Sequence, residues 1–344
     1  MTANQFGKIF RFVSFGESHG PALGAIVEGC PAGLTLDLAE VQTWLHRRRP
    51  GQDALTSSRN EQDTVEILSG VFENKTLGTP ICMIVRNKDA RSADYNEVKQ
   101  SPRPGHADDM WKNKFGHVDH RGGGRSSGRE TLARVLAGAV AHQLVRFLAP
   151  EVKVTGWVQS VFDLGVNAQE EATLLNSREA YPADQFRLRF PSEKNSQALI
   201  KLLESAKSEG LSYGGVAKVV VQNPPQGLGQ PVFRKIKSDL AQAALSLGAS
   251  MSFELGLGKN VSLQEGSEFH HAMKDPHYGG VRGGMSTGEP IHFQVAFKPT
   301  SSVLDVAKKG RHDPCIVPRA IPVLEAMTWV ILADQLLWKR LDRV

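Results

Sequence analysis

Residues 117–150 have the sequence HVDHRGGGRSSGRETLARVLAGAVAHQLVRFLAP, and this stretch organises the chain. From Leu132 onward, apolar residues recur at three- and four-residue steps until Pro150, which predicts a helix. Ser127 and Glu130 have the spacing of a capping box, so the helix is expected to begin near Gly128. Alanine and glycine fill most remaining positions, and we therefore expect burial on most sides of the helix.

The first half of the stretch has the composition of an anion site. Residues 120–129 contain four glycines, three arginines and two serines. Glycines let a ligand approach the backbone N–H groups at the positive end of the following helix, and guanidinium groups add charge-assisted hydrogen bonds. A tight glycine turn with solvated arginines is the structural alternative, and the stretch alone does not decide between the two.

Composition narrows the class of protein. The chain of 344 residues has 40% hydrophobic and 22% charged residues, as in a well-packed globular protein. The net charge of +5 is modest, and the arginines lie beside Gly, Ser and His, which favours small anionic ligands over nucleic acid. Three widely spaced cysteines are typical of a reducing cytoplasm. We expect a cytoplasmic location without membrane association, because no apolar run approaches membrane-spanning length and the N-terminus lacks a signal-peptide pattern.

Hydrophobic patterns predict a chain of alternating strands and helices. Residues 86–115 are expected to form an irregular loop, and 163–215 a peripheral segment with two helices at most. The expected strands are 7–15, 23–28, 65–72, 80–85, 153–162, 216–222 and 291–297, and the expected helices are 37–45, 128–149, 235–247 and 320–341.

One short pattern occurs twice. Pro31-Ala-Gly-Leu34 and Pro225-Gln-Gly-Leu228 each stand between an expected strand and an expected helix. This repetition suggests an internal duplication of a strand–helix unit. Since no linker separates the halves, a single domain over residues 1–344 is expected.

Other segments carry groups suited to acid–base chemistry or anion binding. Together they indicate an enzyme that acts on a phosphorylated, anionic small molecule. They are the histidine-containing turns Gly16-Glu-Ser-His-Gly20 and Arg103-Pro-Gly-His106, the three arginines 47–49, the glycine-rich loop 279–288, Lys298-Pro-Thr-Ser-Ser302 and Gly310-Arg-His-Asp-Pro314.

Three other classes of site have weaker support. His117 and His120 could bind a metal ion, but no HExxH, CxxC or EF-hand pattern accompanies them, and no metal site is expected. The chain lacks a Walker motif, and it lacks GxGxxG between a strand and a helix. RNA binding through the Gly/Arg runs would need aromatic side chains for base stacking, and few lie near them.

Six motifs in order resemble those of the chorismate synthase family. The three longest are residues 16–31, GESHGPALGAIVEGCP; 122–138, GGGRSSGRETLARVLAG; and 310–322, GRHDPCIVPRAIP. The others are RRRPGQ at 47–52, RPGHAD at 103–108 and KPTSS at 298–302. The resemblance covers nearly the whole chain and implies an α+β fold, a β-α-β sandwich with a central helical layer between sheets, assembled as a homotetramer.

The resemblance also implies a reaction, the last step of the shikimate pathway. In an anti-1,4-elimination, 5-enolpyruvylshikimate 3-phosphate loses phosphate from C3 and a proton from C6 to give chorismate. The reaction is redox-neutral overall but requires reduced FMN. Whether NADPH serves as an upstream reductant stays open.

Where a motif of this chain matches a family motif, the resemblance implies which residues are functional. The two histidines would protonate the departing phosphate and the flavin, with their individual roles left open, and the aspartate would accept a proton through flavin N5. The implied catalytic residues are His19, His106 and Asp313; the implied flavin contacts are Arg125, Ser126, Ser127, Gly248, Ala249, Gly283, Lys298, Pro299, Thr300, Ser301, Ser302 and Arg311; and the implied substrate contacts are Arg48, Arg103 and Arg129.

Two departures from the family pattern stand out. Asp53-Ala54 occupies the place where the family usually has Ser-Arg, so one expected cation is missing and an acid is present. An NADPH contact inferred from that arginine is therefore not carried over. The segment between Ser302 and Gly310 is also short, and a surface hairpin of some family members is expected to be absent.

Overall fold

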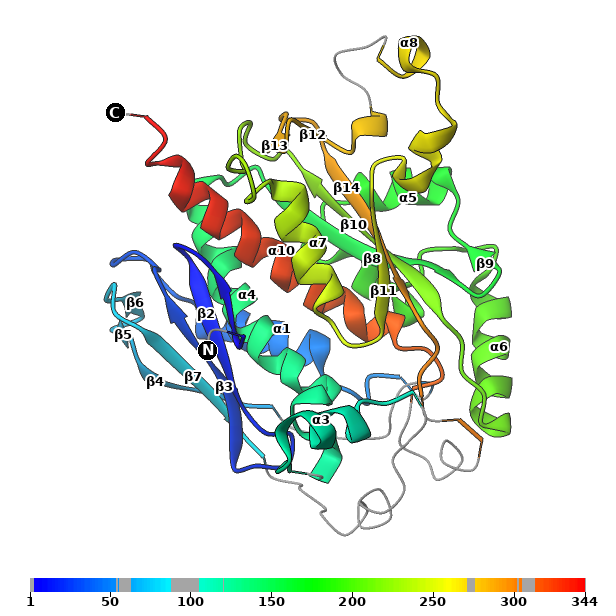
Figure 1. The fold of residues 1–344 in the computed structure, drawn as a ribbon, viewed down its shortest axis with the longest axis horizontal. Coiled ribbons are helices and arrows are strands. Elements are labelled where there is room, and N and C mark those ends of the chain that lie inside the picture. Colours follow the sequence, from blue (N-terminus) through cyan, green and yellow to red (C-terminus); the bar gives the residue numbers. More distant parts are fainter. Residues whose placement is uncertain are drawn as a thin grey trace.

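The protein consists of two five-stranded antiparallel sheets with helices between them (Figure 1). The computed structural model describes residues 3–53, 55, 63–87, 105–119, 121–270, 276–301, 303–304 and 313–343. The first sheet has the order β1 (Gln5–Gly7), β2 (Arg11–Gly16), β3 (Ala22–Glu28), β7 (Ile81–Arg86), β4 (Val65–Ser69). The second has the order β11 (Ser250–Leu255), β14 (Ile291–Phe297), β10 (Gly215–Gln222), β8 (Lys153–Val161), β9 (Leu164–Gly165).

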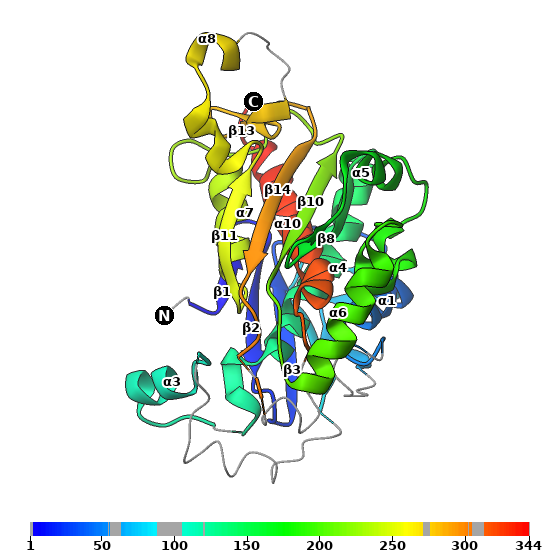
Figure 2. The ribbon, with the colours of Figure 1, turned by 90° about the vertical axis from the view of Figure 1, so that its right-hand side faces the viewer.

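The helical layer is centred on α4 (Thr131–Leu148) and α10 (Val317–Lys339), with α1 (Leu38–Arg48) and α7 (Ile236–Leu245) beside them (Figures 1 and 2). Helix α4 packs on β2 and β3, whereas α10 packs on β8 and β10. The two helices approach closely at Gly138, where an added Cβ would lie 2.4 Å from the Cβ of Ala326. The β-α-β sandwich expected from the sequence is thereby confirmed.

Helix α10 is the one described helix whose length and composition would allow it to cross a membrane. The most apolar 18-residue segment of this helix, however, is 94% buried inside the protein. Its surroundings are therefore those of a core helix, which explains why it is apolar on every side.

The two sheets are built from matching units. In the first, a hairpin of β5 (Val71–Phe72) and β6 (Lys75–Thr76) lies between β4 and β7 in sequence; in the second, β12 (Val281–Arg282) and β13 (Met285–Ser286) lie between β11 and β14. Apart from short helices before α4 in the first unit, an insertion at 162–214 in the second, and short helical turns between β11 and β12, the units β2-β3-α1-β4-β5-β6-β7-α4 and β8-β10-α7-β11-β12-β13-β14-α10 share the same element order. Strand neighbours also correspond, since β3 and β7 pair as β10 and β14 do.

The repeated Pro-x-Gly-Leu turn confirms the correspondence at the level of single hydrogen bonds. In each unit, a hydroxyl from the small hairpin accepts from the Leu N–H and donates to the Pro carbonyl. Thr76 Oγ1 makes these bonds to Leu34 and Pro31 at 3.0 and 2.6 Å, and Ser286 Oγ makes them to Leu228 and Pro225 at 2.8 and 2.6 Å. The structure thus supports the internal duplication that the sequence suggested.

Several expected boundaries were wrong. The 86–115 loop prediction missed helix α3 (Asp108–Phe115), whose residues are largely exposed and lack a strong apolar stripe. Strand β11 was not expected, and the expected 65–72 strand is divided at Gly70, where φ is 85°. Short elements with weak hydrophobic periodicity, or interrupted by a single glycine, are difficult to predict from sequence patterns.

The helix start near Gly128 is confirmed, but the capping box does not form. Ser127 accepts only a long hydrogen bond from the Arg129 N–H, at 3.4 Å, and the first turn Gly128–Glu130 is a 3₁₀ helix. The Glu130 carboxylate instead binds Arg134. A side-chain ion pair therefore replaces the predicted backbone cap.

The segment 163–215 has two α-helices as expected, α5 (Ala168–Leu175) and α6 (Ser196–Glu209). Between them lie two 3₁₀ turns, Pro182–Gln185 and Arg187–Arg189. We expected few functional residues in this segment. Its charged residues form ion pairs with α1 and with the chain that follows α1, as described below.

Candidate active site

A cavity of about 1000 Å³ lies where the helical layer ends, at the N-termini of α4 and α10. Two corresponding loops border it, the one between β7 and α4 and the one between β14 and α10. Its apolar wall comes from several elements, whereas basic and hydroxyl side chains line the rest. The apolar residues include Phe12, Trp111, Phe115, Leu247, Ile316 and Val323, and the polar residues include Arg48, His106, Arg125, Ser126, Ser127, Arg129, Arg134, Lys298, Thr300, Ser301 and Asp313.

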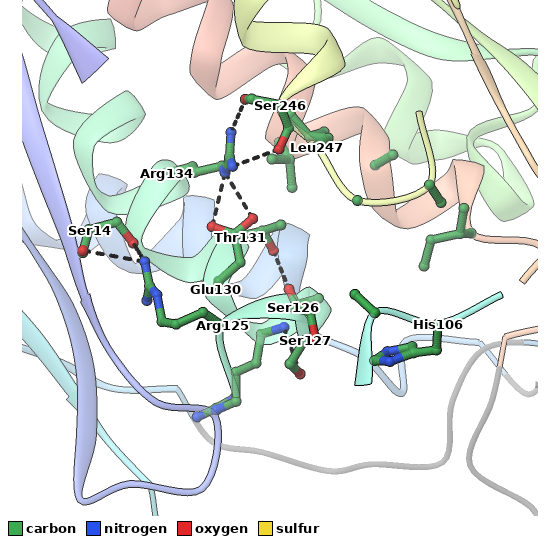
Figure 3. A pocket seen from close by; sticks show the side chains of 18 of the residues that line it. Ser14, His106, Arg125, Ser126, Ser127, Glu130, Thr131, Arg134, Ser246 and Leu247 are labelled. Carbon is green, nitrogen blue, oxygen red and sulfur yellow. Dashed lines mark hydrogen bonds and ion pairs between the residues drawn. The ribbon is translucent and has the colours of Figure 1, made fainter. Parts of the chain in front are cut away.

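Arg125 joins the glycine-rich loop to strand β2. Its Nη1 donates to the Gly16 carbonyl at 2.8 Å. Its Nη2 donates to the Ser14 hydroxyl at 2.6 Å (Figure 3). The guanidinium is thus held by neutral oxygens of the first sheet and keeps its positive charge beside the cavity. It also fixes this loop against the strand that leads into the His19 turn.

Arg129 and Arg48 approach the same carboxylate. Arg129 Nη2 lies 3.0 Å from Asp63 Oδ1, and Arg48 Nη1 lies 3.7 Å from Asp63 Oδ2. All three side chains are at least 94% buried. Two guanidinium groups thus lie together at the cavity wall, and groups of this kind suit an anionic ligand.

The neighbouring Arg47 belongs to a different network. Its guanidinium lies 2.6 Å from Glu325 on α10 and also pairs with Asp184. The ring of Tyr181 lies 3.9 Å from its Cζ, and burial raises the pKa of that tyrosine to about 12. Arg47 therefore holds α1 against α10, and only Arg48 of the two lines the cavity.

Lys298 and Ser301 hold the loop that carries His106. Lys298 Nζ and Ser301 Oγ donate to the carbonyl of Gly105 at 3.1 and 2.9 Å, and the two side chains lie 3.2 Å apart. Gly105 has φ of 73°, a conformation that favours glycine. His106 itself is half-buried and lines the cavity. The second unit thereby positions a histidine from the first.

Asp313 lies at the start of the loop that enters α10. Its Oδ2 accepts from Arg319 Nη1 at 2.7 Å, and its backbone carbonyl accepts from the Thr300 hydroxyl at 3.0 Å. The residue is 94% buried, and the Arg319 guanidinium is an adjacent cation that pairs with its carboxylate. Both Asp313 and Arg319 line the cavity.

Arg134 connects α4 to the end of α7 (Figure 3). Its Nε binds the Glu130 carboxylate at 3.0 Å, Nη1 donates to the Ser246 hydroxyl at 2.6 Å, and Nη2 donates to the Ser246 carbonyl at 3.0 Å. Gly248 and Ala249 follow Ser246 and line the cavity. Ala249 has φ of 69°, a strained value for a residue with a Cβ, so this wall depends on such anchors.

His19 lies in the turn between β2 and β3. It is buried, with Nδ1 3.1 Å from the Ser18 hydroxyl. His19 is not among the described residues that line the cavity. Beside it, burial raises the pKa of Glu17, an effect that the Arg125 guanidinium opposes. The turn is a partly desolvated place for a proton carrier.

Not every residue implied by the family motifs meets at the cavity. Gly283 lies in the turn between β12 and β13, and exposed Pro299 packs near Gly214; neither lines the cavity. The implied contacts Arg103, Ser302 and Arg311 lie outside the described residues. The other implied flavin and substrate residues are brought together there.

Asp53, which stands where the family usually has serine, is ion-paired away from the cavity. Its carboxylate binds Arg187 at 2.7 Å, and this hydrogen bond holds the pKa of Asp53 below its usual range. The acid therefore ties the chain after α1 to the segment 163–215, and it adds no negative charge to the cavity lining.

Sequence reasoning missed four residues that shape the site: Asp63, Asn87, Arg134 and Arg319. Arg134 stands four residues after Glu130 on a helix, a spacing that predicts an ion pair. Arg319 lies within the third family motif. Asp63 and Asn87 gave no local signal, because their partners are distant in sequence. Among the described residues, no group of three His, Cys, Asp or Glu could hold a metal ion.

The fold and the cavity define a class: a β-α-β sandwich enzyme with a partly open cavity, lined by several cationic side chains, that suits a small anionic ligand. Comparison with known proteins identifies the family. The family model described as chorismate synthase matches residues 10–337. This chain therefore belongs to the chorismate synthase family and is a lyase of chorismate and aromatic amino-acid biosynthesis.

Individual relatives agree over full length. A chorismate synthase of Bdellovibrio bacteriovorus is 55% identical, with 100% of both chains covered. One from Opitutus terrae is 44% identical over 98% of this chain and 97% of the relative. A solved crystal structure of a chorismate synthase is 32% identical with a TM-score of 0.76, covering 97% of this chain and 93% of that one.

Proposed function

We propose that the protein converts 5-enolpyruvylshikimate 3-phosphate into chorismate. A proton leaves C6 and the C6–H electron pair forms a double bond to C1. The existing C1=C2 pair shifts to C2=C3, and the C3–O pair leaves with the phosphate. The observation that carries this proposal is the convergence of Arg48, Arg129, Lys298 and Arg319 on one cavity. A substrate with one phosphate and two carboxylates needs several fixed cations of this kind.

The cavity also fits FMN, which the family requires in reduced form. Lys298, whose ammonium group has a third N–H, could bind its phosphate, and the hydroxyl oxygens of Ser126, Thr300 and Ser301 could accept from its ribityl hydroxyls. Trp111 and Leu247 offer apolar surface for its ring. Reduced FMN supplies an electron-rich ring that the elimination needs although no net oxidation occurs. The volume of about 1000 Å³ leaves room for a second small molecule.

The proposed residue roles follow from position. Arg48 and Arg129 would bind the anionic groups of the substrate, and Arg125 would fix the glycine-rich loop while contributing positive charge. His106, in the cavity, and His19, in the adjacent turn, would hold protons for the departing phosphate and the flavin. Asp313, which Arg319 holds by a hydrogen bond, would accept a proton and pass it outward.

Further parts of the proposal concern the whole protein. We propose that residues 1–344 act as one domain, as a homotetramer in the cytoplasm, without nucleic-acid or membrane partners. NADPH is proposed only as an outside source of electrons for the flavin. Light scattering at several protein concentrations tests the tetramer.

An anaerobic phosphate-release assay tests the activity. With substrate and reduced FMN, the protein should release phosphate and chorismate in equal amounts. Oxidised FMN should give no product, and an NADPH source should restore activity only together with a flavin reductase. Equal turnover without flavin would overturn the proposed mechanism, and absence of chorismate under every condition would overturn the proposed function.

A further inference from the structure

Asn87 joins two of the proposed functional groups through one side chain. It directly follows β7 and belongs to none of the six family motifs. Its Oδ1 accepts from Arg129 Nε at 2.8 Å. Its Nδ2 donates to the carbonyl of Gly20 at 2.7 Å, with the carbonyls of Glu17 and Ser18 at 3.3 Å.

The chemistry of the partners fixes the orientation of this amide. A guanidinium has only donors, so the amide oxygen must face Arg129. Backbone carbonyls have only acceptors, so the NH₂ group must face the turn that contains His19. A carboxylate could serve the first partner but not the second, and an apolar side chain could serve neither. An amide at this position satisfies both.

Each side of this connection has other contacts that the Asn87 side chain complements. The Arg129 guanidinium is held at Nη2 by Asp63, and the bond from Nε to Asn87 sets the plane of the group. Within the His19 turn, the Gly20 N–H donates to the Glu17 carbonyl at 3.0 Å. The Asn87 N–H donates to the Pro21 carbonyl at 3.0 Å, so both backbone and side chain of Asn87 hold the end of this turn.

We propose that Asn87 is a positioning residue that sets the placement of His19 relative to Arg129. It acts on the reaction through these two groups and has no direct part in the chemistry. This inference rests on the proposed function, in which Arg129 binds substrate and His19 holds a proton.

Two variants separate the two sides of the connection. Asn87→Asp keeps an oxygen for Arg129 but loses the donors to the turn, so it should preserve KM within about threefold and lower kcat about 10–100-fold. Asn87→Leu loses both sides and should also raise KM about tenfold. The control Asn195→Ala removes an amide that donates to the Gly165 carbonyl outside the cavity, and should leave kcat and KM unchanged.

The experiment combines kinetics under anaerobic conditions with hydrogen–deuterium exchange of peptides covering residues 14–24, after thermal melting shows that each variant is folded. Faster exchange in the turn for both Asn87 variants, together with the kcat and KM split, supports the inference. Wild-type kinetics or wild-type exchange in Asn87→Asp overturns it. If the wild-type protein makes no chorismate, the proposed function fails, and the exchange measurement alone decides whether Asn87 positions the turn.

Discussion

Arg47 and Arg48 are adjacent in α1, yet their guanidinium groups lie in separate ion networks. Arg47 binds Glu325 at 2.6 Å in the helical layer, whereas Arg48 lies 3.7 Å from Asp63 at the cavity. The Arg47 side chain therefore holds two helices together, whereas the Arg48 side chain lines the cavity and is proposed to bind the ligand. The two functions should separate when each arginine is changed alone.

Arg47→Ala should destabilise the protein strongly. It leaves the buried carboxylate of Glu325 without its cation, and removal of one partner of a buried pair costs about 3–5 kcal/mol. Urea unfolding at neutral pH measures the loss. The control Arg11→Ala breaks an exposed pair with Glu28 and should change the free energy of unfolding by less than about 1 kcal/mol. Similar losses for both variants would contradict the assignment.

Arg129→Ala should act mainly on substrate binding. Loss of a charge-assisted contact to an anionic group should raise KM about 10–100-fold, with a smaller change in kcat. Steady-state phosphate release measures both constants. Arg146→Ala on the same helix, where the side chain is 58% exposed, is the matched control. An unchanged KM in Arg129→Ala would exclude Arg129 from substrate binding.

His106→Ala should lower turnover by about two to four orders of magnitude, the usual contribution of a general acid. Flavin affinity should change little, because Lys298 and Ser301 still hold the Gly105 backbone. Single-turnover kinetics with reduced FMN measures the effect. Exposed His46 gives the control variant His46→Ala. A loss within assay scatter would leave His106 as a loop residue without a catalytic role.

Arg134→Met should weaken flavin binding. The variant keeps an unbranched side chain but releases Ser246, and with it the wall formed by Gly248 and Ala249. We expect the Kd for FMN to rise about tenfold, the loss of one to two hydrogen bonds. Quenching of flavin fluorescence measures the Kd, and Arg146→Met is the control. An unchanged Kd would show that this wall does not contact the flavin.

Arg187→Ala should remove a pH-dependent contribution to stability. The pKa of Asp53 is lowered in the folded protein, so its ion pair stabilises the fold above the unfolded value of about 3.9 and loses this effect as pH falls through the lower folded value. The pair is partly exposed and should contribute less than about 1 kcal/mol at pH 7. Urea unfolding at pH 7 and pH 3 should show the difference from wild type shrinking in acid. A constant difference would assign the effect to packing.

Sequence patterns predicted the long elements well and the short ones poorly. Helix α4 was recognisable because its apolar residues keep one period over five turns, and α10 because it is apolar throughout. Helix α3 escaped, since its exposed residues share no apolar face. The Pro-x-Gly-Leu turns were visible in sequence, but the hydroxyls that complete them, Thr76 and Ser286, come from later hairpins.

Sequence motifs identified residues that line the cavity, but they did not predict the contacts between those residues. Family motifs named Arg48, Arg129 and His106, which do line one cavity. The contacts that orient them join residues far apart, as when Asn87 meets Arg129 across 42 positions. Arg47 meets Glu325 across 278 positions, and no local pattern encodes such a distance. Tertiary packing decides which of two adjacent arginines lines the cavity.

The matched units have an evolutionary consequence. A chain carrying one unit alone would leave the apolar side of its central helix uncovered, and two copies would have to associate to bury it, as α4 and α10 now do within one chain. In such a pair the two loops beside the cavity would be identical. Fusion of the copies would free each loop to change independently. One now provides His106 and Arg129 and the other Lys298 and Asp313, a division of labour that a symmetric ancestor could not have had.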